Sequence, residues 1–335
     1  MKPSIDAVRL VNGFRIFQLV VAASRLKIPD LVADGPKTAD ELAASTETHG
    51  PSLRRMLRGL AAWSFLDEQA DGRFAATPLS DTFRSDTPGL RNMTIMLSEE
   101  AYQAWGDLLY TVRTGKPAFE HVFGKNRWDQ LAENPEAAAI FNAAMVELSS
   151  RIAKSFADSY DIGSARTVVD VGGGNGALLI AVLQAHPEVR GVLFDLAQGL
   201  AGAEEKLAAA GVADRVILQE GSFFETVPSG GDVYLHKSIV LDWDDERALA
   251  ILQSCRRAMN DKGRLVILER ELAGRIEDAG KALPSVMSDL NMMVVLGGKE
   301  RTPDEYRALL ERAGLRMTRL LPNESEFAAI EAVVA

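Results

Sequence analysis

The sequence predicts an α/β fold with a mixed sheet, preceded by a mostly helical domain of winged-helix type. Three observations support this prediction. From about residue 162, short apolar, β-branched runs alternate with helix-forming segments. The first of these runs enters a glycine-rich loop and then a helix. The last two runs, 316–321 and 327–333, are close enough to pair as an antiparallel hairpin.

The length and the charge limit what kind of protein this is. A chain of 335 residues is long enough for two domains, which we expect at 1–160 and 161–335. Its hydrophobic content of 47% and charged content of 25% are ordinary for a soluble globular protein. A net charge of -10 argues against a nucleic-acid or anionic-membrane partner.

Cysteine and histidine usage argues against disulfides and metals. The single cysteine, Cys255, cannot form an internal disulfide framework or a cysteine metal site, and it suits a reducing compartment. No two histidines stand at metal-ligand spacing, so no metal is expected. No signal peptide is visible, and apolar runs near the start, such as 19–23, are too short to span a bilayer. We therefore expect a cytoplasmic protein.

The first helix is expected over about residues 5–26. Apolar side chains recur there at helical spacing and continue round more than one face of the helix. Such a helix packs against two things, its own domain and a second subunit.

The next segment has a winged-helix pattern. Thr38 with Glu41 forms a capping box at the start of one helix, a second helix follows over 53–63, and 65–74 forms a small hairpin. A DNA-reading domain should be clearly basic, yet residues 1–90 hold 11 Lys/Arg and 11 Asp/Glu. The pattern therefore favours an interaction domain over a DNA reader.

Residues 88–160 are expected to be mostly helical and rich in methionine and aromatic side chains. Most of these side chains are core residues, but a subset could line an apolar pocket, because methionine adapts to flat ligands and aromatic rings stack on them. His121 is expected in a loop between helices and is kept as a candidate functional residue.

The second domain is organised around the segment Thr167–Ala177. An apolar strand ends in Asp170, passes through four glycines in five residues, and enters a helix. Glycines let a ligand lie against bare backbone, and the following helix N-terminus attracts an anionic group. The pattern fits both a dinucleotide loop and the loop that binds S-adenosylmethionine (SAM).

The order of the following elements favours SAM. A second strand, 190–194, ends at Asp195, about twenty residues past the loop, where a carboxylate binds a ribose diol. Further strands are expected at 216–218, 232–235 and 264–268, with helices at 200–211, up to 259, and at 303–313. Five β/α units closed by a hairpin is the order of a Rossmann-like SAM methyltransferase domain. A dinucleotide domain more often continues with β/α units.

The chain resembles the small-molecule O-methyltransferases of the plant and bacterial caffeate, acetylserotonin and polyketide type over nearly its whole length. Seven segments match in order: Phe119–Asn126, Asp170–Gly176, Phe194–Leu196, Gly221–Phe224, Asp242–Glu246, Asp289–Met293 and Gly297–Thr302. The resemblance implies SAM as cofactor and an aromatic small molecule as substrate. It also implies a homodimer formed through the N-terminal domain.

The same resemblance implies the roles of individual residues. The cofactor would be held by Asp170, Gly172, Gly174, Asp195, Leu196, Ser222, Phe223 and Lys237. The substrate would be contacted by Met145, Ser238, Leu241, Asp242, Asn291 and Met292.

Two positions depart from the family pattern. Ser222 stands where the family has an aspartate near the adenine, which weakens one contact. Leu241 stands where the family has its catalytic histidine, although the acids that orient this histidine are kept as Glu269 and Glu300. A phenol with a pKa near 10 must lose a proton, and a positioned base typically contributes about 10²–10⁴-fold.

Three hypotheses remain open for the chemistry. The substrate is already acidic, or is an amine or ring carbon, so that holding the reactants together suffices. Alternatively another residue is the base, with Glu269, Glu300, His121 and His236 as candidates. Of these, His236 precedes Lys237 at the end of a strand and faces the opposite way, which favours a structural role. In the third, SAM is retained for non-methylating chemistry such as hydroxylation, decarboxylation or cyclisation. An NAD-dependent oxidoreductase is a more distant alternative.

Overall fold

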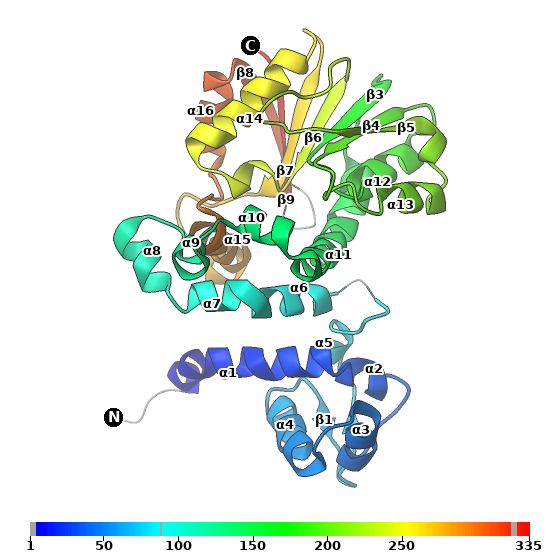
Figure 1. The fold of residues 1–335 in the computed structure, drawn as a ribbon, viewed down its shortest axis with the longest axis vertical. Helices are drawn as coiled ribbons and strands as arrows, with labels where there is room; N and C mark the ends of the chain where they lie inside the picture. The colour runs from blue at the N-terminus through cyan, green and yellow to red at the C-terminus, as the bar shows by residue number, and fades with distance from the viewer. Residues whose placement is uncertain (1–4, 88, 323–326) are drawn as a thin grey trace. The chain divides into compact units, whose positions relative to one another are not determined.

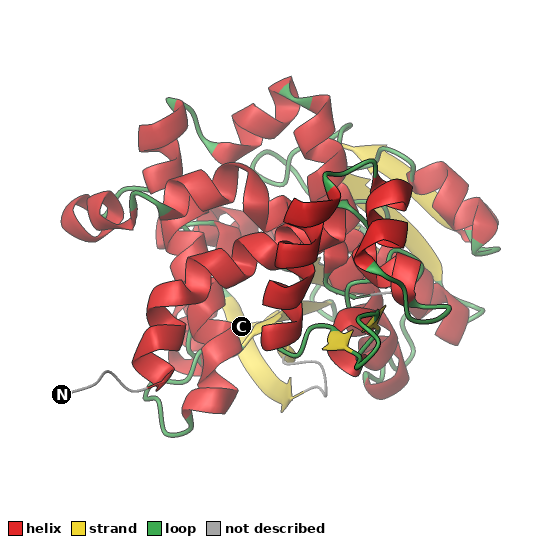
Figure 2. Cartoon of the chain, turned by 90° about the horizontal axis from the view of Figure 1, so that it is seen from below, coloured by secondary structure: helices red, strands yellow, loops and turns green. Residues whose placement is uncertain are grey.

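The computed structural model describes residues 5–87, 89–322 and 327–335. It divides into two compact units (Figure 1). The first unit comprises residues up to Tyr102 together with Glu136–Leu148. The second comprises Gln103–Pro135 and Ser149–Ala335. Most of the described chain is helical, and the strands form a seven-stranded sheet and a small hairpin (Figure 2).

The first unit is a helical domain with a two-stranded wing. Its elements are α1 Ile5–Arg25, α2 Ile28–Val32, α3 Ala39–Thr46, α4 Gly50–Ala62, β1 Asp67–Glu68, β2 Phe74–Ala75, α5 Pro78–Asp81, α6 Arg91–Met96 and the π-helical turn η1 Leu97–Ala101. The predicted capping box is confirmed, since the Thr38 hydroxyl accepts the Glu41 N–H and the Glu41 carboxylate accepts the Thr38 N–H. Helix α4 begins at Gly50, earlier than predicted, because Pro51 suits its first turn.

Helix α1 is buried near its C-terminal end and exposed near its start. Ala23 is fully buried, whereas Leu10 is 84% and Val11 74% exposed. The stretch Ala7–Arg25 is long and apolar enough to cross a membrane by length and composition. That corrects the expectation that apolar runs here are too short. A single such helix near the N-terminus is weak evidence for a span, because core helices of soluble proteins pass the same test.

Short helices open the second unit. They are α7 Tyr102–Trp105, α8 Leu108–Thr114, α9 Ala118–Phe123 and α10 Arg127–Glu133. The long helix α11, Pro135–Ser159, contributes its last part to this unit. His121 lies within α9, so the prediction that it lies in a loop is wrong.

The sheet has the order β5-β4-β3-β6-β7-β9-β8. Its strands are β3 Thr167–Val171, β4 Arg190–Asp195, β5 Val216–Glu220, β6 Val233–Lys237, β7 Arg264–Arg270, β8 Leu315–Pro322 and β9 Phe327–Val334. The first five are parallel. The predicted antiparallel hairpin of β8 and β9 is confirmed, and β9 also pairs antiparallel with β7. The strand order reverses at β3, so the crevice between the carboxyl ends of β3 and β6 is the expected ligand position.

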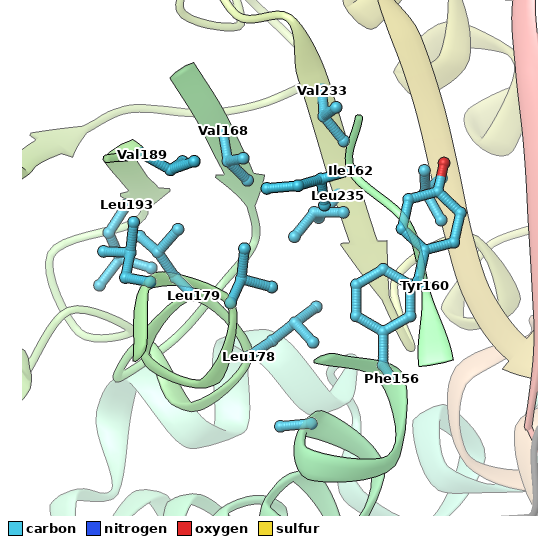
Figure 3. Close-up of a cluster of buried hydrophobic side chains, with 14 of the residues drawn as sticks. Phe156, Tyr160, Ile162, Val168, Leu178, Leu179, Val189, Leu193, Val233 and Leu235 are labelled. Carbon is cyan, nitrogen blue, oxygen red and sulfur yellow. The ribbon is translucent and has the colours of Figure 1, made fainter. Parts of the chain in front are cut away.

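Helices cover both faces of this sheet. They are α12 Ala177–Ala185, α13 Ala203–Ala209, α14 Asp245–Ala258 and α16 Pro303–Arg312. The unit also contains α15 Ala279–Asn291, the short turns η2 Ala213–Arg215 and η3 Val240–Asp242, and the π-helical η4 Met292–Leu296. On one face, α11 and α12 pack through Phe156, Leu178 and Leu179 against strand residues such as Val168 (Figure 3). On the other face, α14 and α16 build a second core.

Helix α15 was not predicted. The sequence pattern left a gap before Asp289, and Pro284 inside the segment argues against a helix. The helix begins where the Asp278 carboxylate accepts the N–H groups of Gly280 and Lys281. It then runs into the π-helical turn η4.

Candidate functional site

The glycine loop, residues 172–176, joins β3 to α12. Gly172, Gly174 and Gly176 all have positive φ, which L side chains rarely adopt. A Cβ on Gly172 would meet the Ile239 side chain at 2.5 Å, and one on Gly173 would meet the Asp170 carboxylate at 2.6 Å. Gly174, in contrast, faces open space. The loop therefore forms a bare backbone cradle.

Asp170 is buried beneath this loop at the end of β3. Its Oδ2 atom has no hydrogen-bond partner among the described residues. Burial raises the pKa of Asp170 to about 7, although nearby Lys237 opposes the shift. An unpaired buried carboxylate oxygen is costly unless a ligand pairs with it.

Asp195 closes the other side of the glycine loop. Its Oδ2 accepts the N–H of Gly174 at 2.8 Å, and its Oδ1 accepts the N–H of Leu196 at 2.7 Å. Burial raises the pKa of this carboxyl. The Leu196 side chain beside it stays 44% exposed, which leaves an apolar surface next to a hydrogen-bonding carboxylate.

Lys237 and Ser238 lie at the carboxyl end of β6. Burial lowers the pKa of Lys237 to about 8, against the influence of Asp170 and Asp242. The ammonium donates to the Ser238 hydroxyl at 3.3 Å. Ser238 has φ 55°, a strained conformation of the kind that clusters at functional sites.

An aromatic cluster flanks the loop. The Phe223 ring lies 3.6 Å from where a Gly172 Cβ would stand. Trp243 packs edge-on against Phe224 with ring centroids 4.8 Å apart, and stacks with Trp128 at 6.1 Å. The Ser222 hydroxyl accepts the N–H of Phe224 at 3.3 Å. Phe223, one of the residues expected to hold the cofactor, thus stands beside the loop.

Leu241 lies in the turn formed by residues 240–243, which follows β6. The Glu269 carboxylate fixes this turn, because its Oε1 accepts the N–H groups of Ile239, Val240 and Leu241 at 3.2, 2.7 and 3.1 Å. The Tyr306 hydroxyl donates to the other oxygen. Both oxygens of Glu269 are therefore occupied.

The segment 298–301 fixes the same turn through hydrogen bonds to its carbonyl groups. The buried Arg301 guanidinium donates to the carbonyls of Val240 at 3.0 Å and Trp243 at 2.9 Å, and pairs with Asp245 at 2.9 Å. The Lys299 N–H donates to the Leu241 carbonyl at 2.9 Å. A fixed turn thus presents Leu241, which is 5% exposed.

Three carboxyls gather around this turn. Burial raises the pKa of Asp242 to about 8, of Glu269 to about 8 and of Glu300 to about 7, and Glu300 adds to the shift of the other two. Neither oxygen of Glu300 has a partner of normal hydrogen-bond geometry in the described chain, although the Ser288 hydroxyl is near enough to lower its pKa.

The two histidines of interest do not stand in the 240–243 turn. His121 Nδ1 contacts Asp107 at 2.7 Å, and its ring stacks on Tyr110 with centroids 4.0 Å apart, at an exposed helix contact. His236 is fully buried, and its Nε2 contacts the Cys255 sulfur at 3.0 Å. Burial lowers the pKa of His236 to about 3, so it stays neutral.

The expected substrate residues fall in both units. Asn291 ends α15, where its Oδ1 accepts the indole N–H of Trp105 at 2.9 Å, and Met292 follows in η4. Asp289, two residues before Asn291, accepts the Glu300 N–H at 3.0 Å. Met145 lies on the part of α11 that belongs to the first unit, whereas the site described here is built from the second.

Sequence reasoning missed Tyr306, Arg301 and Trp105. Arg301 stands inside a segment that was matched as a motif, but nothing in the pattern indicates that its guanidinium binds two carbonyls of a distant turn. Tyr306 and Trp105 act through contacts with Glu269 and Asn291, which are far away in the chain.

Two family models match the chain. The O-methyltransferase domain matches residues 105–316, and the O-methyltransferase dimerisation domain matches residues 8–86. Phenazine O-methyltransferase PhzM of Lysobacter antibioticus is 42% identical over 326 residues, which cover 97% of this chain and 94% of that protein. The crystal structure of LaPhzM superposes with a TM-score of 0.91 at 41% identity, and covers 98% of both chains.

Two further relatives carry information on ligands and chemistry. The O-methyltransferase NcsB1 from neocarzinostatin biosynthesis, solved with SAM and 2-hydroxy-5-methyl naphthoic acid, has a TM-score of 0.81 at 30% identity and covers 95% of this chain and 96% of that one. Aclacinomycin 10-hydroxylase RdmB of Streptomyces purpurascens is 35% identical over 301 residues, covering 88% of this chain and 80% of the relative.

These matches decide between the two cofactors that the glycine loop allowed. The O-methyltransferase model covers all seven segments matched as motifs, the dimerisation model covers the winged-helix pattern, and the sheet order and terminal hairpin agree with the methyltransferase order. The chain therefore belongs to the SAM-dependent O-methyltransferase family and carries its dimerisation domain.

Proposed function

We propose that the methyl acceptor is a hydroxyl group, or else a nitrogen or ring carbon, of a flat aromatic small molecule of secondary metabolism. The carrying observation is the fixed 240–243 turn, which presents an apolar leucine where the family pattern has its base. Met292 in η4 and the Trp243 cluster supply apolar and aromatic surface in the same unit. The phenazine and naphthoic acid relatives support an aromatic substrate.

The residues around the glycine loop fit the cofactor. Bound there, SAM supplies a methyl group activated on a sulfonium. Gly174 faces open space and leaves room for its methionyl part, and the unpaired Asp170 oxygen is an acceptor for an ammonium group. Asp195 keeps lone pairs for a ribose diol, and Leu196 and Phe223 offer apolar faces for the adenine. Ser222 precedes Phe223 in the chain, and Lys237 lies close to Asp170.

Rate enhancement then rests chiefly on holding the reactants in line, which can supply about 7–11 kcal/mol. Leu241 cannot take a proton. Of the candidate bases, Glu269 already has both oxygens occupied, and His121 is engaged with Asp107. Glu300 is the candidate whose oxygens are both unpaired in the described chain, and burial holds its pKa near 7, so we assign proton uptake to it.

Three further statements belong to the same proposal. The protein acts as a homodimer through its N-terminal domain, which the match to the dimerisation domain and the exposed apolar start of α1 support. It works in the cytoplasm on a small molecule, and the net charge of -10 argues against a nucleic-acid or anionic-membrane partner. The strands and motifs of the α/β fold begin after residue 160, so the predicted domain division stays there, although the compact units of the structure divide near Tyr102.

The test is incubation of the purified protein with SAM carrying a deuterated methyl group and a panel of hydroxyphenazines and hydroxynaphthoic acids. We expect one compound to gain the labelled methyl group, and NMR of the product to place it on oxygen, nitrogen or carbon. If no compound in the panel gains the label, the proposed substrate class is wrong.

A second candidate function is non-methylating chemistry with SAM retained. Leu241 and the similarity to a hydroxylase favour it. In that case the product gains an oxygen atom, or loses carbon dioxide, and carries no deuterated methyl group.

A further inference from the structure

The amide of Asn291 is fixed in one orientation by its partner. An indole N–H can only donate a hydrogen bond, so the atom 2.9 Å from Trp105 Nε1 must be the amide oxygen of Asn291. The other orientation would bring an NH₂ group against an N–H. The Asn291 Nδ2 atom is thereby left as the outward-facing end of the amide, with two donors.

These two donors have no partner within the described chain. Among the described residues, the Asn291 side chain forms a hydrogen bond with Trp105, and the residue is half-buried. The accessible NH₂ group can therefore bind a ligand, whereas an acceptor group at this position would need Asn291 to flip against Trp105.

Asn291 lies on the segment that leads to the 240–243 turn, which carries Leu241. The residue ends α15 and begins the π-helical turn η4, and π-helical turns occur often at functional sites. The next residues along, 297–299, pack on the 240–243 turn: a Gly298 Cβ would lie 2.1 Å from the Leu241 carbonyl oxygen. Asp289, two residues before Asn291, holds the Glu300 N–H. One short segment therefore carries both Asn291 and the groups that fix Leu241.

We propose that Asn291 selects aromatic substrates that present a hydrogen-bond acceptor, such as a ring nitrogen, carbonyl or carboxylate oxygen, and that Trp105 is the positioning residue that enforces this preference. The inference rests on the proposed function and adds a polar requirement to the flat aromatic class. A molecule without the acceptor leaves a donor unpaired on binding, and one with a donor there meets two N–H groups.

The experiment compares two molecules of the same shape. 1-Hydroxyphenazine and 1-hydroxyanthracene differ only in two ring atoms, which are acceptor nitrogens in the first and C–H groups in the second. Their dissociation constants are measured by calorimetry on the protein loaded with S-adenosylhomocysteine. We expect the phenazine to bind about tenfold more tightly, the value of one neutral hydrogen bond.

Three variants assign the preference to this amide. Asn291→Leu should abolish it, and Asn291→Asp, whose second oxygen is an acceptor, should weaken phenazine binding below anthracene binding. Trp105→Phe frees the amide to flip, so the ratio should shrink while both compounds still bind. Trp63→Phe, in the first unit, is the matched control and should keep the wild-type ratio.

The outcomes separate this inference from the proposed function. Equal binding of the two compounds, binding of neither, or an unchanged ratio in Asn291→Leu overturns the acceptor preference. The methyl-label experiment is independent of that ratio. In ¹⁵N NMR, the indole signal of Trp105 should also shift in Asn291→Leu without any ligand, and no shift would show that the fixing hydrogen bond is absent.

Discussion

Leu241 and Glu300 together define the chemistry at the scale of single residues. The leucine side chain has no group that can accept a proton, while Glu300 keeps a buried carboxyl with both oxygens unpaired in the described chain. An imidazole at position 241 would give such a carboxyl a hydrogen-bond partner, and the turn that carries position 241 is already fixed by Glu269 and Arg301. The surroundings of an imidazole at position 241 are thus present without the imidazole.

Leu241→His should therefore raise kcat/KM for a phenolic substrate by about 10²-fold, the low end of what a positioned base contributes. The profile of kcat/KM against pH should gain a rising limb near the histidine pKa of about 6.5. Leu241→Met is the matched apolar control. An unchanged rate in Leu241→His, or an equal rise in Leu241→Met, would show that proton removal does not limit the reaction.

Glu300 should also make the free energy of unfolding depend on pH. Its folded pKa of about 7 lies above its ordinary value of 4.5, so the folded protein keeps a proton that the unfolded chain releases between these two values. Stability from this group therefore falls as the pH rises through that window, by about 3 kcal/mol in total. Urea unfolding at about pH 5 and about pH 7.5 measures the fall.

Glu300→Gln should reduce this fall, because glutamine does not titrate. Glu305→Gln is the control on the same segment: the pKa of Glu305 is lowered, so its contribution runs in the opposite direction. If Glu300→Gln loses as much stability between the two pH values as the unmodified protein, Glu300 does not hold its proton in the folded state.

At the scale of elements, the 298–301 segment acts as a clamp on the 240–243 turn. Gly298 has no space for a side chain, since a Cβ would lie 2.1 Å from the Leu241 carbonyl oxygen and 2.4 Å from the Asp242 carbonyl carbon. Backbone atoms cannot yield as a flexible side chain does, so the clamp and the turn fit together only with glycine here.

Gly298→Ala should push the clamp away from the turn and cost about 1–3 kcal/mol of unfolding free energy. It should also weaken substrate binding more than cofactor binding, because the glycine loop lies elsewhere. Gly274→Ala is the control, since a Cβ there meets nothing within 4 Å. Urea unfolding and calorimetry check both effects, and equal stability of the two variants would contradict the clamp.

The elements themselves follow largely from the sequence. Strand β3 and the glycine loop, the capping box at Thr38 and the terminal hairpin are all local patterns, and the structure confirms each of them. Helix α15 was missed because Pro284 breaks the helical pattern, and tertiary contacts override that preference. The π-helical turn η4 has no local pattern by which it could be predicted.

The sequence predicts the candidate site only where a residue's place at a strand end or in a loop fixes its neighbours. Asp195 could be placed beside the glycine loop because the ends of neighbouring parallel strands meet. The contacts of Glu269 with three backbone N–H groups, and of Trp105 with Asn291, join residues far apart in sequence. Neither pair leaves a periodic pattern, so both become visible only in the folded chain.

At the scale of the whole molecule, the first unit exposes an apolar surface of the kind that binds another protein surface. Val8, Leu10, Val11 and Phe14 on α1 are between 44% and 84% exposed. A second copy of the chain is the partner that the dimerisation domain indicates. Covering these side chains would remove apolar surface from water, which stabilises a contact by about 25 cal/mol for each Å² buried.

Leu10→Glu combined with Val11→Glu should dissociate the dimer, because two charges would be buried at the contact. Ile217→Glu, at another position that is 64% exposed, is the control and should leave the dimer intact. Sedimentation velocity measures the mass. A monomeric unmodified protein, or a dimer that survives both charges, would contradict a contact through α1.

The protein should transfer the methyl group of SAM to an aromatic acceptor although position 241 carries no base. The most direct measurement is the amount of S-adenosylhomocysteine formed for each molecule of product, with SAM carrying a deuterated methyl group and the unmodified protein. We expect one S-adenosylhomocysteine for each product, and the deuterated methyl group in every product molecule. Product that forms without S-adenosylhomocysteine and without the label would contradict it.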